Sequence, residues 1–130
     1  MADNFDAVQI TYDIIKTCGV SVFQDRILKD QAGEYVVVGS NACNNLPAVN
    51  VAQVNVNIYI PRSTNGMPNR TRLEAVRTSI LTLIGNATAP AGYYCVIDQI
   101  FSALLNDVRE GYDCFTIRLE LTLNNTRYVS

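Results

Sequence analysis

Apolar and polar residues alternate along the C-terminal part of the chain, and this pattern constrains the fold more than any other feature. Between Cys114 and Asn124, every second residue is apolar: Phe115, Ile117, Leu119, Leu121 and Leu123. Threonine, arginine and glutamate fill the positions between them. A period of two over this length indicates a β-strand that buries only one of its faces. The chain is therefore expected to contain a sheet with one side on a hydrophobic core.

Residues 51–60 show the same alternation. The apolar positions are Val54, Val56, Ile58 and Ile60. Pro61 then removes a backbone donor and ends the strand. The opposite face carries polar but uncharged side chains: Gln53, Asn55, Asn57 and Tyr59. Such a face is either ordinary solvent-exposed surface or the lining of a protein contact or a lumen, and we take these four residues as a candidate lumen or contact face.

Two segments have the spacing of amphipathic helices. In the first, Val8, Tyr12 and Ile15 recur at helical intervals, and Gly19 is suited to end the helix. The second is expected over residues 68–84, where Pro68 fits a first-turn position. Its apolar stripe consists of Leu73, Val76, Ile80, Leu83 and Ile84.

The remaining segments complete a sheet. Residues 20–28 and 35–39 are predicted to be short strands that form a hairpin. Residues 93–107 fit a helix by periodicity and a strand by the β-propensity of their aromatic and β-branched start. We favour a long strand paired with residues 114–124. The expected fold is one α+β domain over residues 1–130, a mostly antiparallel sheet of roughly four to five strands with two helices packed on one face.

Two polar segments are predicted to be loops that touch neighbouring molecules. Residues 40–50 are rich in asparagine and contain a proline, which favours irregular backbone. Residues 62–66 follow the second alternating strand and lead into the second helix. Long polar loops in compact domains are often contact loops, and a plain connector is the alternative. The candidate inter-subunit contacts are placed in residues 40–50 and 62–72, and they are Asn41, Asn44, Asn45, Arg62, Asn65, Arg70 and Arg72.

The net charge of −2 hides an uneven distribution along the chain. Residues 62–77 contain four arginines and one glutamate, a local charge of +3. Residues 1–34 contain six acidic and three basic residues, a local charge of −3. The two segments are either solvated surface or complementary faces that pair head to tail between neighbouring copies. Because proteins that grip DNA by its phosphates need a cationic face, sequence-specific nucleic-acid binding is not expected.

The residue types that carry most enzyme and metal chemistry are missing or scattered. The sequence has no histidine and no glycine-rich phosphate loop. Four cysteines lie apart from one another, as Cys18, Cys43, Cys95 and Cys114. Buried free thiols are expected for them, with one disulfide left open. The acidic residues Asp107, Glu110 and Asp113 read as a solvated turn, with a cation site as the alternative. We therefore expect no catalytic residue, cofactor or metal, and no segment apolar enough to span a membrane.

The order of these elements resembles the tail-terminator and tail-completion proteins of tailed bacteriophages. The segments that carry the resemblance are residues 56–62, 72–77, 102–107, 111–112 and 115–121. The likeness extends from about Phe5 to Asn124, and it also favours a strand for residues 93–107. The asparagine-rich segment 40–50 departs from the family pattern.

The resemblance implies a structural protein that works as a ring. The ring would contain about six or twelve copies, join or terminate the tail at the head–tail junction, and contact other neck, portal or tail proteins. DNA would pass through its lumen without being gripped, and no membrane would be involved. The protein would assemble in the bacterial cytoplasm and end in the virion. A small non-enzymatic adaptor or ligand-binding module is the alternative, and an enzyme that uses carboxylates and a cysteine is a third hypothesis.

Overall fold

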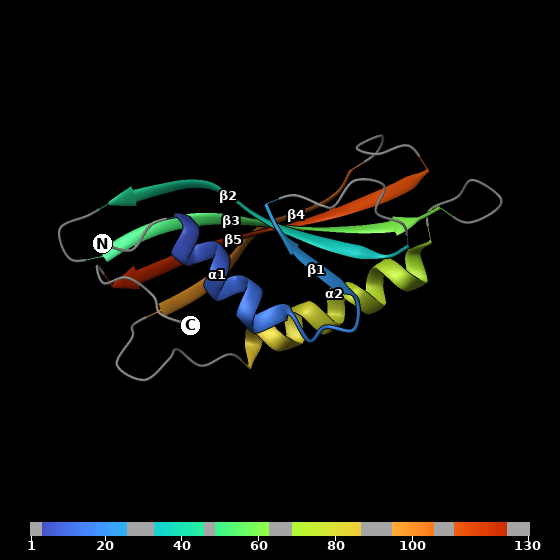
Figure 1. Cartoon of the computed structure of the whole chain (residues 1–130), viewed down its shortest axis with the longest axis horizontal. Helices are drawn as coiled ribbons and strands as arrows, with labels where there is room; N and C mark the ends of the chain where they lie inside the picture. Colours follow the sequence, from blue (N-terminus) through green and yellow to red (C-terminus); the bar gives the residue numbers. More distant parts are fainter. Residues whose placement is uncertain are drawn as a thin grey trace.

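A five-stranded sheet and two helices make up the part of the chain that the structure, a computed structural model, describes (Figure 1). The described residues are 4–25, 33–45, 49–62, 69–86, 95–105 and 111–124. In chain order the elements are α1 (Asn4–Ile15), β1 (Ser21–Gln24), β2 (Tyr35–Asn45), β3 (Val49–Pro61), α2 (Arg70–Gly85), β4 (Cys95–Leu105) and β5 (Tyr112–Asn124).

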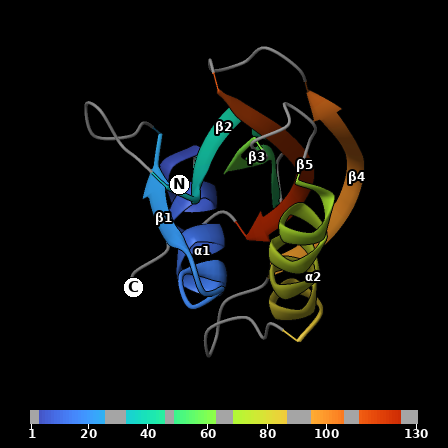
Figure 2. The same cartoon turned by 90° about the vertical axis from the view of Figure 1, so that its right-hand side faces the viewer.

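The strands lie in the order β1-β2-β3-β5-β4, so β3 is central and β1 and β4 are the edges. The pairs β2–β3, β3–β5 and β4–β5 are antiparallel, and β1–β2 is parallel. Figure 2 shows the two edges on opposite sides of a curved sheet, with both helices within the curve. The expected α+β class with a mostly antiparallel sheet is therefore confirmed.

The core forms where the two alternating strands meet. Val54 lies opposite Leu119 and Val56 lies opposite Ile117, and all four side chains are fully buried. Because side chains of paired strands point to the same face, the two sequence patterns merge into one continuous apolar surface. This confirms the predicted inward face of both strands.

The helices cover that apolar surface. Helix α1 contributes the buried Val8 and Ile15, and helix α2 contributes the buried Leu73, Val76 and Ile80. Thr11 is buried as well, and its hydroxyl donates a hydrogen bond to the Ala7 carbonyl at 2.9 Å. The polar group in the core is thus satisfied within its own helix.

Helix α2 begins later than residue 68, because Asn69 caps it. The Asn69 side-chain oxygen accepts a hydrogen bond from the backbone N–H of Arg72 at 3.3 Å. Asparagine is among the preferred residues at this position because its side chain satisfies an otherwise unpaired backbone donor. At the other end, the Asn86 N–H donates to the Thr82 carbonyl at 3.0 Å.

The prediction of a loop over residues 40–50 is wrong. Strand β2 continues to Asn45 and β3 begins at Val49, while residues 46–48 lie outside the described residues. The partner strand supplies ladder hydrogen bonds, and this outweighs the low β-propensity of asparagine. A register shift between Ser40 and Ala42 admits one extra residue in β2, as in a β-bulge.

The predicted hairpin of residues 20–28 and 35–39 is also wrong. The first strand spans only Ser21–Gln24, and its pairing with β2 is parallel, with Ser21 opposite Tyr35. The chain leaves β1 at Asp25, whose backbone has φ 64° and whose N–H donates to the Val38 carbonyl at 2.7 Å. Two consecutive parallel strands need a connection that brings the chain back to the end at which the first strand began, and a tight turn cannot do this.

The ambiguous segment 93–107 is a strand from Cys95 to Leu105, as favoured. It pairs with β5 from Cys95 opposite Leu123 to Leu105 opposite Cys114, with a register shift between Gln99 and Phe101. The backbone of β5 decides between a helix and a strand for this segment, because β5 offers hydrogen-bond partners on the side away from β3. The periodicity of the segment alone cannot reveal such partners.

Replacing Ile58 by alanine is expected to lower the free energy of unfolding by roughly 2–5 kcal/mol, because a fully buried side chain leaves a cavity in the core. Asn57→Ala is the matched control on the opposite face of the same strand, with an expected loss below about 1 kcal/mol. Urea unfolding followed by circular dichroism measures both values. Similar losses for the two variants would contradict the assignment of the faces.

Candidate functional site

The face of the sheet opposite the helices carries the predicted candidate surface. Gln53, Asn55, Asn57 and Tyr59 are all half-buried there, while their neighbours in β3 are buried under the helices. The four side chains therefore share one face, and we call the sheet surface around them the outer face.

One half of the outer face is polar and carries charges of both signs. The Arg118 Nε donates a hydrogen bond to the Asn55 side-chain oxygen at 3.1 Å. Gln53 lies opposite Glu120, and Asn57 lies opposite Thr116. Arg118 and Glu120, two positions apart on β5, bring opposite charges to this half.

The other half of the outer face is an aromatic cluster that the sequence did not predict. The rings of Tyr35 and Tyr59 stack with centroids 4.7 Å apart and an interplanar angle of 17°. The ring centroids of Phe23 and Tyr112 lie 6.3 and 5.8 Å from the centroid of the Tyr35 ring. Tyr35 itself is only 1% exposed. The aromatic residues come from four strands, so only the strand register brings them together.

Cys114 lies beside this cluster and is a buried free thiol, as is Cys18. Burial raises the pKa of the Cys114 thiol to about 11, and a hydrogen bond with the Tyr59 side chain opposes this rise. A thiol with a raised pKa is a poor nucleophile, because the thiolate is the reactive form. The free, buried state expected for Cys18 and Cys114 is confirmed, and the backbones of Cys43 and Cys95 lie in β2 and β4.

Arg62, a predicted contact residue, forms an ion pair with an acidic residue of its own chain. Its Nε lies 3.3 Å from the Asp113 Oδ1, and Asp113 is 1% exposed. The Arg62 N–H also donates to the Gly111 carbonyl at 2.9 Å, so the end of β3 is fixed to the start of β5. Of the predicted acidic cluster, Asp113 thus serves this pair, while Asp107 and Glu110 lie outside the described residues.

Arg72, a second predicted contact residue, forms a two-armed ion pair with Glu34. The Glu34 oxygens accept from the Arg72 Nε at 2.7 Å and from its Nη2 at 2.6 Å. These hydrogen bonds hold the pKa of the Glu34 carboxyl below its usual value; partial burial opposes the shift, and the arginine charge adds to it. The pair joins the acidic segment 1–34 to the basic segment 62–77 within one chain.

The remaining candidate contacts are spread over the fold. Arg70 is exposed in the first turn of α2, beside a small hollow of about 120 Å³. In that hollow the Arg77 guanidinium lies 5.6 Å from the centroid of the Phe115 ring. The backbones of Asn41, Asn44 and Asn45 lie in β2, and Asn65 lies outside the described residues. The structure therefore does not gather the predicted residues into one site.

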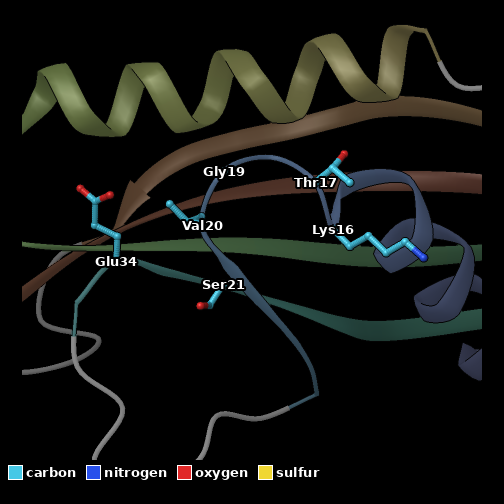
Figure 3. A pocket seen from close by; sticks show the side chains of 6 residues that line it. All are labelled: Lys16, Thr17, Gly19, Val20, Ser21 and Glu34. Carbon is cyan, nitrogen blue, oxygen red and sulfur yellow. The ribbon is translucent and has the colours of Figure 1, made fainter.

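A wide hollow of about 610 Å³ lies between the end of α1 and the start of β2, but it is open and its polar groups do not converge. Figure 3 shows the side chains of Lys16 and Glu34 pointing away from each other. Glu34 is held by Arg72, and the Lys16 Nζ lies 3.7 Å from the Asp13 Oδ1. Because ligand sites enclose their ligand with convergent polar groups, this hollow does not support the ligand-binding alternative.

Among the residues that the structure describes, no three histidine, cysteine or acidic side chains come together as metal ligands would. Neither α1 nor α2 is long and apolar enough to cross a membrane.

The fold is shared with solved protein chains of very low sequence identity. One belongs to the virion of a native gene transfer agent particle: it is 9% identical, with a TM-score of 0.59 over 95% of this chain and 92% of that chain. A second solved chain is 12% identical, with a TM-score of 0.55 over 98% and 94% of the two chains. A protein from Akkermansia muciniphila reaches a TM-score of only 0.48 at 11% identity, over 96% of this chain and 53% of that chain.

No protein-family model and no curated protein matches the chain. At such identities the likeness establishes the fold alone. The fold defines an α+β domain in which two helices cover one face of a mostly antiparallel sheet. In that fold the chain is similar, over nearly its whole length, to a chain of the gene transfer agent virion particle.

The Glu34–Arg72 pair predicts a specific pH dependence. Because the folded pKa of Glu34 is lowered, its stabilising effect is full above the unfolded pKa of about 4.3 and is lost as the pH falls through the folded pKa. Glu34→Gln is therefore expected to cost about 0.2–1 kcal/mol at pH 7, the size of a surface ion pair, and nothing near pH 2. Urea unfolding at both pH values measures the difference. An equal cost at both would contradict the electrostatic origin.

The raised pKa of Cys114 predicts slow alkylation. At pH 7 a thiol with a pKa of about 11 has roughly 300-fold less thiolate than one with a pKa of about 8.5. Iodoacetamide labelling with peptide mass spectrometry should modify Cys114 rapidly only after unfolding in urea. Tyr59→Phe removes the group that lowers the pKa, so labelling should not accelerate in this variant. A rate close to that of free cysteine in the folded protein would contradict the assignment.

Proposed function

We propose that the protein is a structural subunit of the virion of a tailed phage or a phage-like particle. It assembles as a ring at the head–tail junction, where it joins or terminates the tail, and DNA passes through the ring. The observation that carries this proposal is the fold likeness to a chain of the gene transfer agent virion particle, which extends over 95% of this chain and 92% of that one. The order of elements in the sequence independently resembles the tail-terminator family.

The outer face supports a role in assembly. An antiparallel sheet can leave one face open, and here that face carries uncharged amides beside the half-buried Tyr59 and Tyr112, whose rings pack on the buried Tyr35. Tyrosine is enriched in protein interfaces because one side chain offers both apolar area and a hydroxyl. The polar half, with Asn55, Asn57 and the oppositely charged Arg118 and Glu120, suits a lumen. DNA is held through counterion release by cationic residues, so such a surface lets it pass without strong binding.

The protein acts by geometry and is not an enzyme. The sequence lacks histidine, and the buried Cys114 has a raised pKa that disfavours a nucleophilic role. Its partners are further copies of itself and other neck, portal or tail proteins. It assembles in the cytoplasm of the bacterial host and remains in the virion.

Arg70 is the predicted arginine best placed to reach such a partner, because it is exposed at the start of α2. Arg62 and Arg72 pair with acids of their own chain, and the Arg72–Glu34 pair draws on both of the oppositely charged segments. Charge pairing between neighbouring copies is therefore a smaller part of assembly than the sequence alone suggests.

The purified protein is expected to form rings of fixed copy number. Light scattering after size-exclusion chromatography gives the mass of the assembly, and negative-stain images show whether it is a ring with a central channel. When tailless capsids or tail tubes are added, the protein should cap them or join them. A monomer at millimolar concentration that also fails to bind such components would contradict the proposal. A monomer whose melting temperature rises with a small metabolite would favour the ligand-binding alternative.

A further inference from the structure

Both edges of the sheet have backbone that no described strand pairs. Strand β4 is at one end of the strand order, and no other described strand pairs with the outer side of its 11 residues. At the other end, β1 pairs with only four of the 11 residues of β2, from Tyr35 to Val38. The last seven residues of β2, 39–45, therefore also lie on an open edge.

Neither open edge has the composition that protects a sheet from further pairing. Natural edge strands are kept single by lysine, proline, short length or inward-pointing charge. Strand β4 reads Cys-Val-Ile-Asp-Gln-Ile-Phe-Ser-Ala-Leu-Leu, with one charged residue and no proline. Residues 39–45 of β2 read Gly-Ser-Asn-Ala-Cys-Asn-Asn, with no charge and no proline. The composition of neither segment therefore prevents the addition of a new strand.

The two open edges match in level and in direction. When the paired residues are followed across the sheet from β2 through β3 and β5 to β4, Gly39 lies at the same position along the strand direction as Phe101. Asn44 lies in the same way at the position of Val96, and such residues are called level. Each step from β2 through β3 and β5 to β4 is antiparallel, so β2 and β4 themselves run in opposite directions. A second copy placed beside the first, with its helices on the same side, would therefore present residues 39–45 antiparallel to residues 95–101.

We propose that β4 of one copy pairs with residues 39–45 of β2 in the next copy, so that the sheet continues from subunit to subunit. The interface is heterologous, because two different edges of the same chain meet, and repeated contacts of this kind close into a ring if the rotation allows. The inference rests on the proposed ring function and adds the contact that builds the ring.

Strand β1 sets the length of the contact. It occupies the edge beside Tyr35–Val38, which is level with Ser102–Leu105 of β4. The second half of β4 would therefore meet the neighbour's β1 unless it turned away. Register shifts at Ser40/Ala42 and at Gln99/Phe101 lie inside the two segments, within a few residues of this boundary. Bulges bend a strand and increase its twist, so pairing is expected to be closest between residues 42–45 and 95–98 and to be lost towards Ser102.

A designed disulfide tests this pairing. In a Cys43→Ser, Cys95→Ser background, Asn44→Cys and Val96→Cys are combined in one chain. Directly opposite residues of an antiparallel pair have Cβ atoms about 4.5–5.5 Å apart, which is close to disulfide geometry. Mild oxidation should link most of the protein into a ladder of covalent oligomers on a non-reducing gel. Cys18 and Cys114 remain, and both are buried.

The matched control combines Asn44→Cys with Ser102→Cys in the same background. Six residues separate positions 96 and 102, a distance of roughly 20 Å along a strand, so no ladder is expected. A ladder from Asn44→Cys with Asp98→Cys would support the same edge pairing in a register shifted by two. Equal linking of the 96 and 102 variants would overturn the pairing, since it would reflect random collision.

Light scattering on the unoxidised variants separates this inference from the proposed function. Rings that form without any link from position 44 to 96 or 98 overturn the edge pairing and leave the ring role standing. A protein that never assembles overturns both. Hydrogen exchange on the unaltered protein gives a second measurement: assembly should slow exchange in residues 39–45 and 95–101 roughly tenfold or more. Unchanged exchange in both segments of an assembled ring would also overturn the pairing.

Discussion

The antiparallel pairing of β3 with β5 is the interaction on which the rest of the structure depends. It runs without a register shift from Val49 opposite Asn124 to Pro61 opposite Tyr112. Within it, valine, isoleucine and leucine from both strands form one fully buried surface, and both helices pack on that surface. Strands β2 and β4 then add on either side, so a slip of one residue between β3 and β5 would turn the whole core toward solvent.

This central pairing also creates the outer face. Every residue that β3 buries under the helices leaves a neighbour pointing the other way, and the register decides what that neighbour meets. Tyr59 meets the Tyr35 ring and the Cys114 thiol, whereas Asn55 meets Arg118. An aromatic half and a polar half therefore arise on one surface, and the proposed ring needs both contact area and a lumen that does not hold DNA.

Two ion pairs of the described residues act within the fold. The Glu34–Arg72 and Arg62–Asp113 pairs connect segments that lie far apart in the sequence and fix the ends of β2, β3 and β5. Because Arg62 and Arg72 have partners within the chain, the proposed association of copies relies more on the backbone edges, the outer face and the exposed Arg70. Backbone pairing is less sensitive to salt than charge pairing, which would suit the proposed assembly.

The sequence by itself determined the faces of β3 and β5, the apolar stripes of the helices and the absence of imidazole chemistry, because periodicity and composition are local properties of the chain. The tertiary structure alone decided that residues 40–45 extend a strand, that β1 runs parallel to β2, and that Tyr35, Tyr59 and Tyr112 meet. It also gave Arg72 an acidic partner 38 residues away. Asparagine-rich backbone becomes a strand when a neighbour supplies its hydrogen bonds, and distant side chains meet only once the register between strands is fixed.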